Sequence, residues 1–159
     1  MTHHLLSGAL AGAAGTTALN AVTYLDMALR ARPASTSPEQ TVYRMEELAN
    51  TPLDASGSNS ESAGNRRSGA GALLGIATGV ATGVLYGMVR SHCPRMPVTV
   101  LALGAGAAAN VGSVAPMTAL GVTDPRQWSG ESWVMDLVPH LAYGVVTAIA
   151  YERLAAGAS

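Results

Sequence analysis

Long apolar stretches alternate with short polar ones along the chain. Four apolar stretches carry few or no charges and are long enough to cross about 30 Å of hydrocarbon, which takes roughly 20 helical residues. They comprise residues 5–29, 69–89, 97–120 and 133–154. Stretches 69–89 and 97–120 show no polar face at helical spacing, which disfavours a soluble helical domain. The pattern therefore predicts an all-α fold, a four-helix transmembrane bundle in a single membrane domain over residues 1–159.

The first stretch has a secretory signal peptide as its alternative. Such a peptide begins with a positively charged region and has an apolar run of about 7 to 15 residues. Here the leading residues offer only His3 and His4, and the apolar run over residues 5–29 is longer. We therefore interpret it as a membrane span of the mature protein. We expect His3, His4 and His92, which lie at the terminus or in a turn, to be solvated.

The polar segment 31–68 separates the first two spans, and a short amphipathic helix is predicted within it at about residues 38–50. Ser37 is a helix N-cap candidate, Pro38 suits the first helical position, and Gln40 stands where a capping box has its acceptor. Its apolar positions recur every three residues, at Val42, Met45 and Leu48. We interpret this helix as a cap over the bundle mouth, with a partner-docking element as the alternative. Residues 55–68 are rich in Ser, Asn and Gly, and are expected to be mobile.

Charge and composition exclude several classes of function. Only 12% of the 159 residues are charged, the nine cations are all Arg, and the net charge is -1. Such a chain offers no basic surface, so we expect no nucleic-acid partner. Cys93 is the single cysteine, which excludes an internal disulfide and a CxxC motif. A phosphate-binding loop and a nucleophile elbow are both missing from the sequence, so we predict that the protein is not an enzyme and binds no cofactor.

Arginine positions predict the orientation of the bundle. Four crossings place both termini on one side, and the segments 31–68 and 121–132 on the other. The loop side holds Arg30, Arg32, Arg44, Arg66, Arg67 and Arg126, whereas the terminal side holds Arg90, Arg95 and Arg153. Because arginine is enriched on the cytoplasmic side of membrane proteins, this count places the long loop in the cytoplasm.

Glycine recurs at every fourth position of the second span, at Gly71, Gly75, Gly79, Gly83 and Gly87. Residues four apart lie on one helix face, so this spacing lets a neighbouring backbone approach closely. Similar small-residue spacing occurs at Gly8 and Gly12 of the first span, and at Gly104, Ala108 and Gly112 of the third. Helices in lipid associate through such close packing, so these glycines predict a tight bundle. An oligomerisation face and a pore lining are the alternatives.

Polar side chains inside the predicted spans form the candidate functional site. Intramembrane ionisable groups are costly and indicate function by default. At about 1.5 Å per residue, the candidates extend from near the loop side to the midplane of the bilayer. They are Asn20, Asn110, Asp136, His140 and Tyr143. Pro116 and Pro139 remove backbone N–H groups on the same half of the bundle, which points to a small hydrated vestibule that opens toward the long loop.

Three interpretations of Asp136 and His140 remain open. The pair could relay a proton or ion, because histidine titrates near neutrality. It could contribute two ligands to a metal, although a metal site needs more. It could also be structural, with Asp136 near a helix N-terminus and His140 hydrogen-bonded to a neighbouring helix. Our predicted site contains no metal.

Two segments resemble a known family. They are Asn110-Val-Gly-Ser-Val-Ala-Pro-Met-Thr-Ala-Leu-Gly-Val-Thr-Asp-Pro125 and Asp136-Leu-Val-Pro-His-Leu-Ala-Tyr-Gly144. Together with the glycine-rich second span, they resemble uncharacterised small inner-membrane proteins of bacteria, distantly YagU-like. The resemblance implies a multi-pass protein of the bacterial inner membrane, but it implies no activity and no catalytic residues. The long polar loop has no counterpart in that resemblance.

From these features we predict a non-enzymatic accessory or assembly subunit of the inner (plasma) membrane. Its partners would be the lipid bilayer and either a larger membrane complex or further copies of itself. The alternative is a small proton, ion or solute channel or transporter that uses the polar vestibule on the loop side.

Overall fold

The computed structural model describes residues 2–51, 53 and 60–157, and these residues are mostly helical. Their elements are α1 (Thr2–Arg30), α2 (Ser37–Ala49), α3 (Ser60–His92), α4 (Val98–Ala119), the 3-10 helix η1 (Pro125–Gln127) and α5 (Gly130–Ala156). No strand occurs among the described residues, which confirms the all-α prediction. By length and composition, α1, α3, α4 and α5 can each cross a membrane. The chain is a multi-pass membrane protein.

Helix α3 begins earlier than the sequence predicts. Residues 60–68 were expected to be mobile, yet they form its first turns. The reason is tertiary, because Ala63 is 2% exposed and Arg67 pairs with Glu46 of α2. A polar segment that lacks an apolar face therefore gains its helical structure from contacts with α2. Residues 55–59 of the expected mobile stretch lie outside the described residues.

Helix α2 lies within one residue of its predicted range, but its N-cap is Thr36 and not Ser37. The amide of Gln40 donates to Thr36 Oγ1 over 2.8 Å, and the Gln40 backbone N–H donates to the Thr36 carbonyl. Asn50 closes the helix with a φ of 50° in the left-handed region, which asparagine tolerates better than most residues. The capping prediction was therefore displaced by one residue, because Ser37 already has helical geometry.

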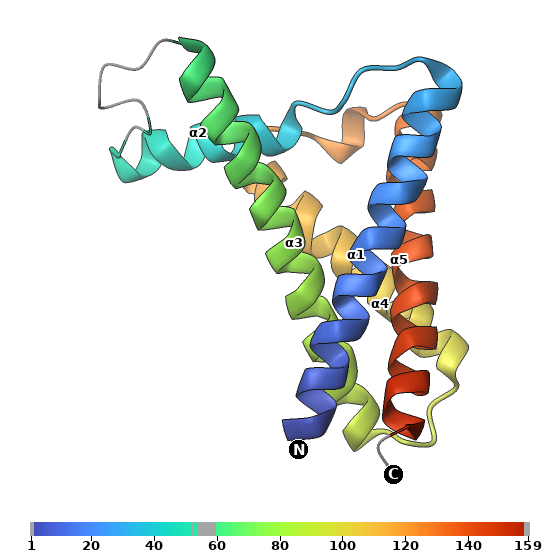
Figure 1. Cartoon of the computed structure of the whole chain (residues 1–159). Coiled ribbons are helices and arrows are strands. Elements are labelled where there is room, and N and C mark those ends of the chain that lie inside the picture. Colours follow the sequence, from blue (N-terminus) through green and yellow to red (C-terminus); the bar gives the residue numbers. More distant parts are fainter. Residues whose placement is uncertain (1, 52, 54–59, 158–159) are drawn as a thin grey trace.

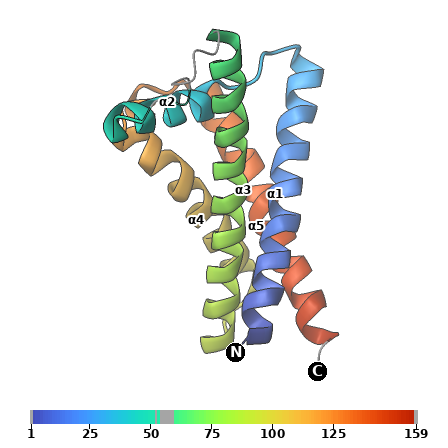
Figure 2. The ribbon, with the colours of Figure 1, turned by 60° about the vertical axis from the view of Figure 1, so that its left-hand side comes forward.

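Helix α1 lies between α3 and α5 and packs along both, while α4 packs along α5 and also contacts α3 (Figures 1 and 2). Both termini lie at one end of the bundle, and α2 lies at the opposite end with the α1–α2 linker (Figure 1). We call these the terminal end and the loop end. Helices α1 and α3 lie side by side near the terminal end and diverge toward the loop end. Helix α2 packs against the loop-end part of α3.

Glycine contacts bring α1 and α3 together at the terminal end. A Cβ atom on Gly12 would lie 2.6 Å from the Gly79 carbonyl oxygen and 2.9 Å from Gly83 Cα. Gly8 likewise meets the backbone of Gly83, and Gly87 meets the His4 carbonyl oxygen. These distances leave no room for a side chain, so the two backbones touch directly. In lipid, this close van der Waals contact is the main attraction between helices.

A second close approach joins α4 to α5. A Cβ on Gly106 would lie 2.8 Å from the His140 carbonyl oxygen, and one on Gly144 would lie 2.7 Å from the Gly106 nitrogen. The small-residue spacing in the sequence predicts this packing for Gly104 and Gly112 of the same span. Gly104 instead has no atom within 4 Å of a built Cβ, and Gly112 meets only the Thr78 methyl group, at 3.2 Å.

The glycine ladder of α3 serves different neighbours along its length. Residues four apart drift by about 40° per step around a helix of 3.6 residues per turn. Gly71 accordingly faces Pro38 of α2, Gly79 meets the Thr16 side chain of α1, and Gly83 and Gly87 meet the α1 backbone. Gly75 has open space around it. The expectation that Gly75 and Gly104 take part in helix packing within the bundle is therefore corrected.

Alanine substitutions distinguish the closely packed glycines from the open ones. In Gly83→Ala the new methyl group would lie 2.6 Å from the Gly12 nitrogen, so α1 and α3 must separate. We expect a loss of about 1–3 kcal/mol in the free energy of unfolding, the usual cost of overpacking. Gly75→Ala is the matched control on the same helix and should change that free energy little. Denaturant unfolding in detergent micelles measures both, and equal stabilities would contradict the packing role.

Candidate functional site

Three polar side chains of the predicted site meet between α4 and α5. The Asn110 amide donates to the Asp136 carboxylate and lies 3.5 Å from His140 Nδ1. His140 Nδ1 is 2.7 Å from the Asp136 carbonyl oxygen and 3.7 Å from the carboxylate oxygen Oδ1. Ser113 Oγ completes the cluster at 3.4 Å from His140 Nε2. We call Asn110, Ser113, Asp136 and His140 the polar cluster.

Helix geometry explains why these groups meet. Asp136 and His140 are four residues apart on α5, so both side chains lie on one face. The close approach of Gly106 and Gly144 brings that face within hydrogen-bonding distance of α4. Ser113 was not predicted, although it lies three residues from Asn110 and thus on the same face of its helix. Its spacing from Asn110 is the signal that could have identified it.

The polar cluster has the chemistry of a proton-binding site. His140 Nδ1 faces two oxygen acceptors, which favours the tautomer with hydrogen on Nδ1 and leaves the Nε2 lone pair toward Ser113. Asp136 and His140 are 20% and 13% exposed, so they are largely withdrawn from the surface. One proton shared by this carboxylate and imidazole makes the pair electrically neutral, which suits a membrane interior. No group of three or more metal-ligating side chains comes together among the described residues.

Tyr143 and Asn20 lie apart from the polar cluster. Tyr143 is fully buried, and its hydroxyl donates to the Gly79 carbonyl of α3 over 2.6 Å. Asn20 is half-buried on α1, and no hydrogen bond to the polar cluster is found for it in the described part of the chain. The structure thus brings together three of the five predicted residues. Tyr143 is not part of the polar cluster because its side chain points toward α1 and α3, whereas the His140 side chain points toward α4.

A second polar group occupies the terminal end. His4 Nδ1 lies 2.6 Å from the Tyr151 hydroxyl, and the Tyr151 ring meets Tyr86 edge-on at 5.1 Å. Arg90 binds the Glu152 carboxylate through two nitrogens, at 2.7 and 3.1 Å. His4 is half-buried, so the expectation that it is solvated was wrong. The first turns of α1 lie against the last turns of α5, because both termini are at this end.

One face of α5 extends from the polar cluster to the polar group at the terminal end, and its polar side chains point toward the other helices. These residues are spaced by three or four, which keeps them on one side of a helix. They are Asp136, His140, Tyr143, Thr147 and Tyr151. Tyr143, Thr147 and Tyr151 are at most 1% exposed, whereas Leu141, Val145 and Ile149 are exposed on the outer side. The sequence-based prediction includes Tyr143 but not Thr147 and Tyr151, although the same spacing connects all three.

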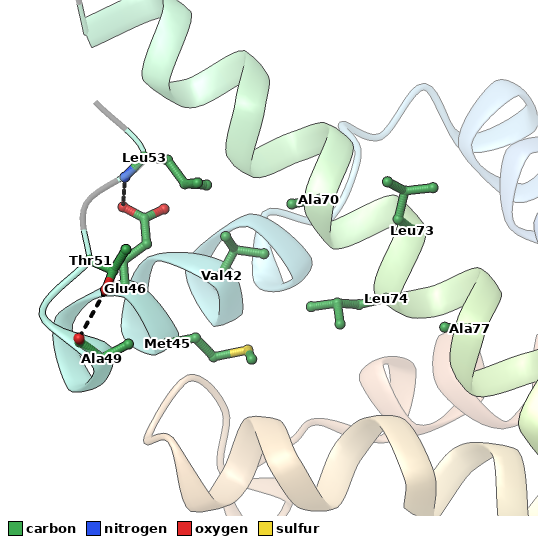
Figure 3. Close-up of a pocket in the computed structure, with 10 residues that line it drawn as sticks. All are labelled: Val42, Met45, Glu46, Ala49, Thr51, Leu53, Ala70, Leu73, Leu74 and Ala77. Atoms are coloured by element: carbon green, nitrogen blue, oxygen red, sulfur yellow. Dashed lines mark hydrogen bonds between the residues drawn. The ribbon is translucent and has the colours of Figure 1, made fainter. Parts of the chain in front are cut away.

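The polar vestibule stays a prediction from the sequence, and the loop end has an apolar groove. It has a volume of about 510 Å³ and lies between α2 and α3 (Figure 3). It is lined by Val42, Met45, Glu46, Ala49, Thr51, Leu53, Ala70, Leu73, Leu74 and Ala77. No residue of the polar cluster lines it. The polar cluster instead lies in the α4–α5 contact, where the glycines allow close approach.

An ion pair fixes α2 to α3 beside this groove. Two nitrogens of Arg67 each lie 2.9 Å from an oxygen of the Glu46 carboxylate, and the Arg67 guanidinium lies 5.0 Å from the centre of the Tyr43 ring. Glu46 also accepts a hydrogen bond from the Leu53 backbone N–H. The hydrogen bonds from Arg67 hold the pKa of Glu46 below its ordinary value, against the effect of burial, which raises it.

No family model matches the chain, and the searches of curated proteins and of solved structures found no match either. The distant resemblance to YagU-like proteins therefore stays a prediction from the sequence.

The Glu46–Arg67 ion pair makes the docking of α2 sensitive to pH. Because the folded-state pKa of Glu46 is lowered, its stabilising contribution is fully present above the ordinary value near 4.5. It is lost as the pH falls through the lower folded-state value. We expect hydrogen exchange at the backbone amides of α2 to accelerate between pH 5 and pH 3, relative to the intrinsic rate, while the exchange of α5 changes less.

Arg67→Gln should produce the same loosening of α2 at neutral pH, since it leaves the Glu46 carboxylate without its charged partner. Loss of such hydrogen bonds to a charged group costs about 1.5–3 kcal/mol. Arg44→Gln is the matched control, because Arg44 and Glu47 form an exposed ion pair within α2, and among the described residues neither is paired with a charge of α3. Exchange rates that respond equally to both substitutions would exclude Arg67 as the anchor of α2.

Proposed function

We propose that this multi-pass protein is a non-enzymatic accessory or assembly subunit of the inner (plasma) membrane, with its long loop in the cytoplasm. The observation that carries this proposal is the outer face of α4. Gly104, Ala108 and Gly112 recur there at spacing four, and all three are exposed. The YagU-like resemblance supports the choice of membrane, and the arginine count supports the orientation.

Small exposed residues are suited to contact with another helix. Lipid tails solvate apolar side chains as well as a protein does, so bulk hydrophobicity gives helices no reason to associate. A face without large side chains instead allows another helix to come close enough for van der Waals contact along its backbone. Within this bundle the α1–α3 and α4–α5 contacts already use glycine in that manner. The α4 face has the same composition and nothing packed on Gly104.

A small proton, ion or solute transporter is the second candidate, and the polar cluster favours it. A carboxylate and an imidazole placed inside a span cost free energy of folding, which an assembly role does not require. Asn110 and Ser113 supply neutral hydrogen-bonding groups around the pair, as a site that gains and loses charge needs. The apolar groove beside α2 offers no route for a polar solute, so this candidate rests on the polar cluster itself.

A leucine at position 104 tests the accessory role. Gly104→Leu adds a large side chain to the exposed α4 face, so we expect it to abolish association while the bundle stays folded. Native mass spectrometry after mild detergent extraction should show wild-type protein in a larger assembly and Gly104→Leu as a monomer. Ala13→Leu, at an exposed position of α1, is the matched control and should retain the assembly. Wild-type protein that is monomeric, or an assembly that survives Gly104→Leu, would refute the proposal.

A further inference from the structure

Among the residues that the structure describes, two hydroxyl groups in the interior of the bundle have no hydrogen-bond partner. They are Thr147 Oγ1 on α5 and the Tyr86 hydroxyl on α3, whose residues are 0% and 4% exposed. A buried hydroxyl without a partner is unfavourable, whereas valine or phenylalanine would fill nearly the same volume without that cost. Packing alone therefore does not explain why these two side chains carry oxygen.

Both hydroxyls lie along the inner face of α5. Thr147 is one turn from Tyr143 and one turn from Tyr151, and its Oγ1 lies against the backbone of Gly15 in α1. Tyr86 meets the ring of Tyr151 edge-on. From Asp136 to Tyr151 this face rises by about 22 Å at 1.5 Å per residue, which is most of the hydrocarbon thickness.

Each end of this face holds a group that can take up or release a proton. Asp136 and His140 lie near the loop end and keep partial access to the surface. At the terminal end the Tyr151 hydroxyl is bonded to His4, which is half-buried. Between them the polar side chains of this face are the hydroxyls of Tyr143 and Thr147, and a hydroxyl can accept one hydrogen bond while it donates another.

We propose that the inner face of α5 is a proton route across the membrane, with the proton as the transported ion; this deepens the transporter candidate and rests on it. A proton from the loop side binds the Asp136–His140 pair. It moves toward Tyr151 through water molecules that enter the one-turn intervals between hydroxyls, and each hydroxyl accepts a proton on one side and gives up its own on the other. Tyr143 takes part once its O–H turns away from the Gly79 carbonyl, and the proton leaves from His4. No bond other than O–H and N–H bonds is made or broken, and after transfer the Asp136–His140 pair and every hydroxyl are back in their starting protonation states.

The close packing favours a proton over other ions. Tyr143, Thr147 and Tyr151 are at most 1% exposed, so a hydrated cation has no space beside them. Asp136 is the one anionic group in the polar cluster, and α4 contributes only the neutral Asn110 and Ser113. A metal ion or alkali cation would need several oxygen ligands in one place, whereas a proton needs only successive acceptors.

Thr147→Val provides the sharpest test, because it removes the hydroxyl and nearly preserves the shape. We would reconstitute the full chain in liposomes that contain a pH-sensitive dye, and drive proton entry with a potassium diffusion potential set by valinomycin. Wild-type protein should acidify the lumen faster than empty liposomes do. Thr147→Val should slow this flux by about tenfold or more. Its unfolding temperature should be unchanged or higher, because the lost hydroxyl had no partner.

Thr17→Val is the matched control, since Thr17 is exposed on α1 and its hydroxyl donates to the Ala13 carbonyl of the same helix. It should conduct at the wild-type rate, while Asp136→Asn should abolish the flux. Equal fluxes for Thr147→Val and Thr17→Val would overturn the route along α5 and leave transport through the polar cluster standing. Wild-type liposomes no more permeable than empty ones would overturn both the route and the transporter candidate.

Discussion

Direct backbone contact between α1 and α3 is the constraint on which the rest of the structure depends. In lipid there is no gain from hiding apolar side chains, so helices must associate through close van der Waals contact. Gly8 and Gly12 on one helix and Gly83 and Gly87 on the other allow that contact at the terminal end. Helix α5 then packs along α1, and α4 along α5. Because α1 and α4 both pack along α5, the polar face of α5 is directed toward the interior of the bundle.

The same constraint explains where polar groups are tolerated. Close contact of α4 with α5 leaves space only for side chains that bond one another, as Asn110 and Asp136 do. At the centre, Tyr143 satisfies its hydroxyl by bonding to the Gly79 carbonyl, at a position where α3 has no side chain of its own. Toward the loop end the helices diverge, and α2 is held there by the Glu46–Arg67 ion pair and by the close contact of Gly71 with Pro38.

Much of the fold could be predicted from the sequence, because span length and charge depletion depend on the chain alone. The bounds of α1, α4 and α5 accordingly lie within a few residues of the predicted ones. The early start of α3 could not be predicted, since it depends on the contact of Arg67 with Glu46, 21 residues away. The neighbours of Gly71, Gly75 and Gly104 could not be predicted either. Helical spacing shows which residues share a face, but it does not show which element packs against that face. His4 was misjudged for the same reason.

The two candidate functions use different surfaces of the bundle, and the packing makes them compatible. Association would take place on the outer face of α4, around Gly104, whereas proton movement would follow the inner face of α5. The close contact of α4 with α5 at Gly106 and Gly144 lies between these two surfaces. Asn110 belongs to both, because it bonds Asp136 and also lines a shallow groove on α4 with Val111 and Val114. A helix bound on α4 would therefore lie next to the amide that orients the Asp136 carboxylate, so association could change the polar cluster through Asn110 alone.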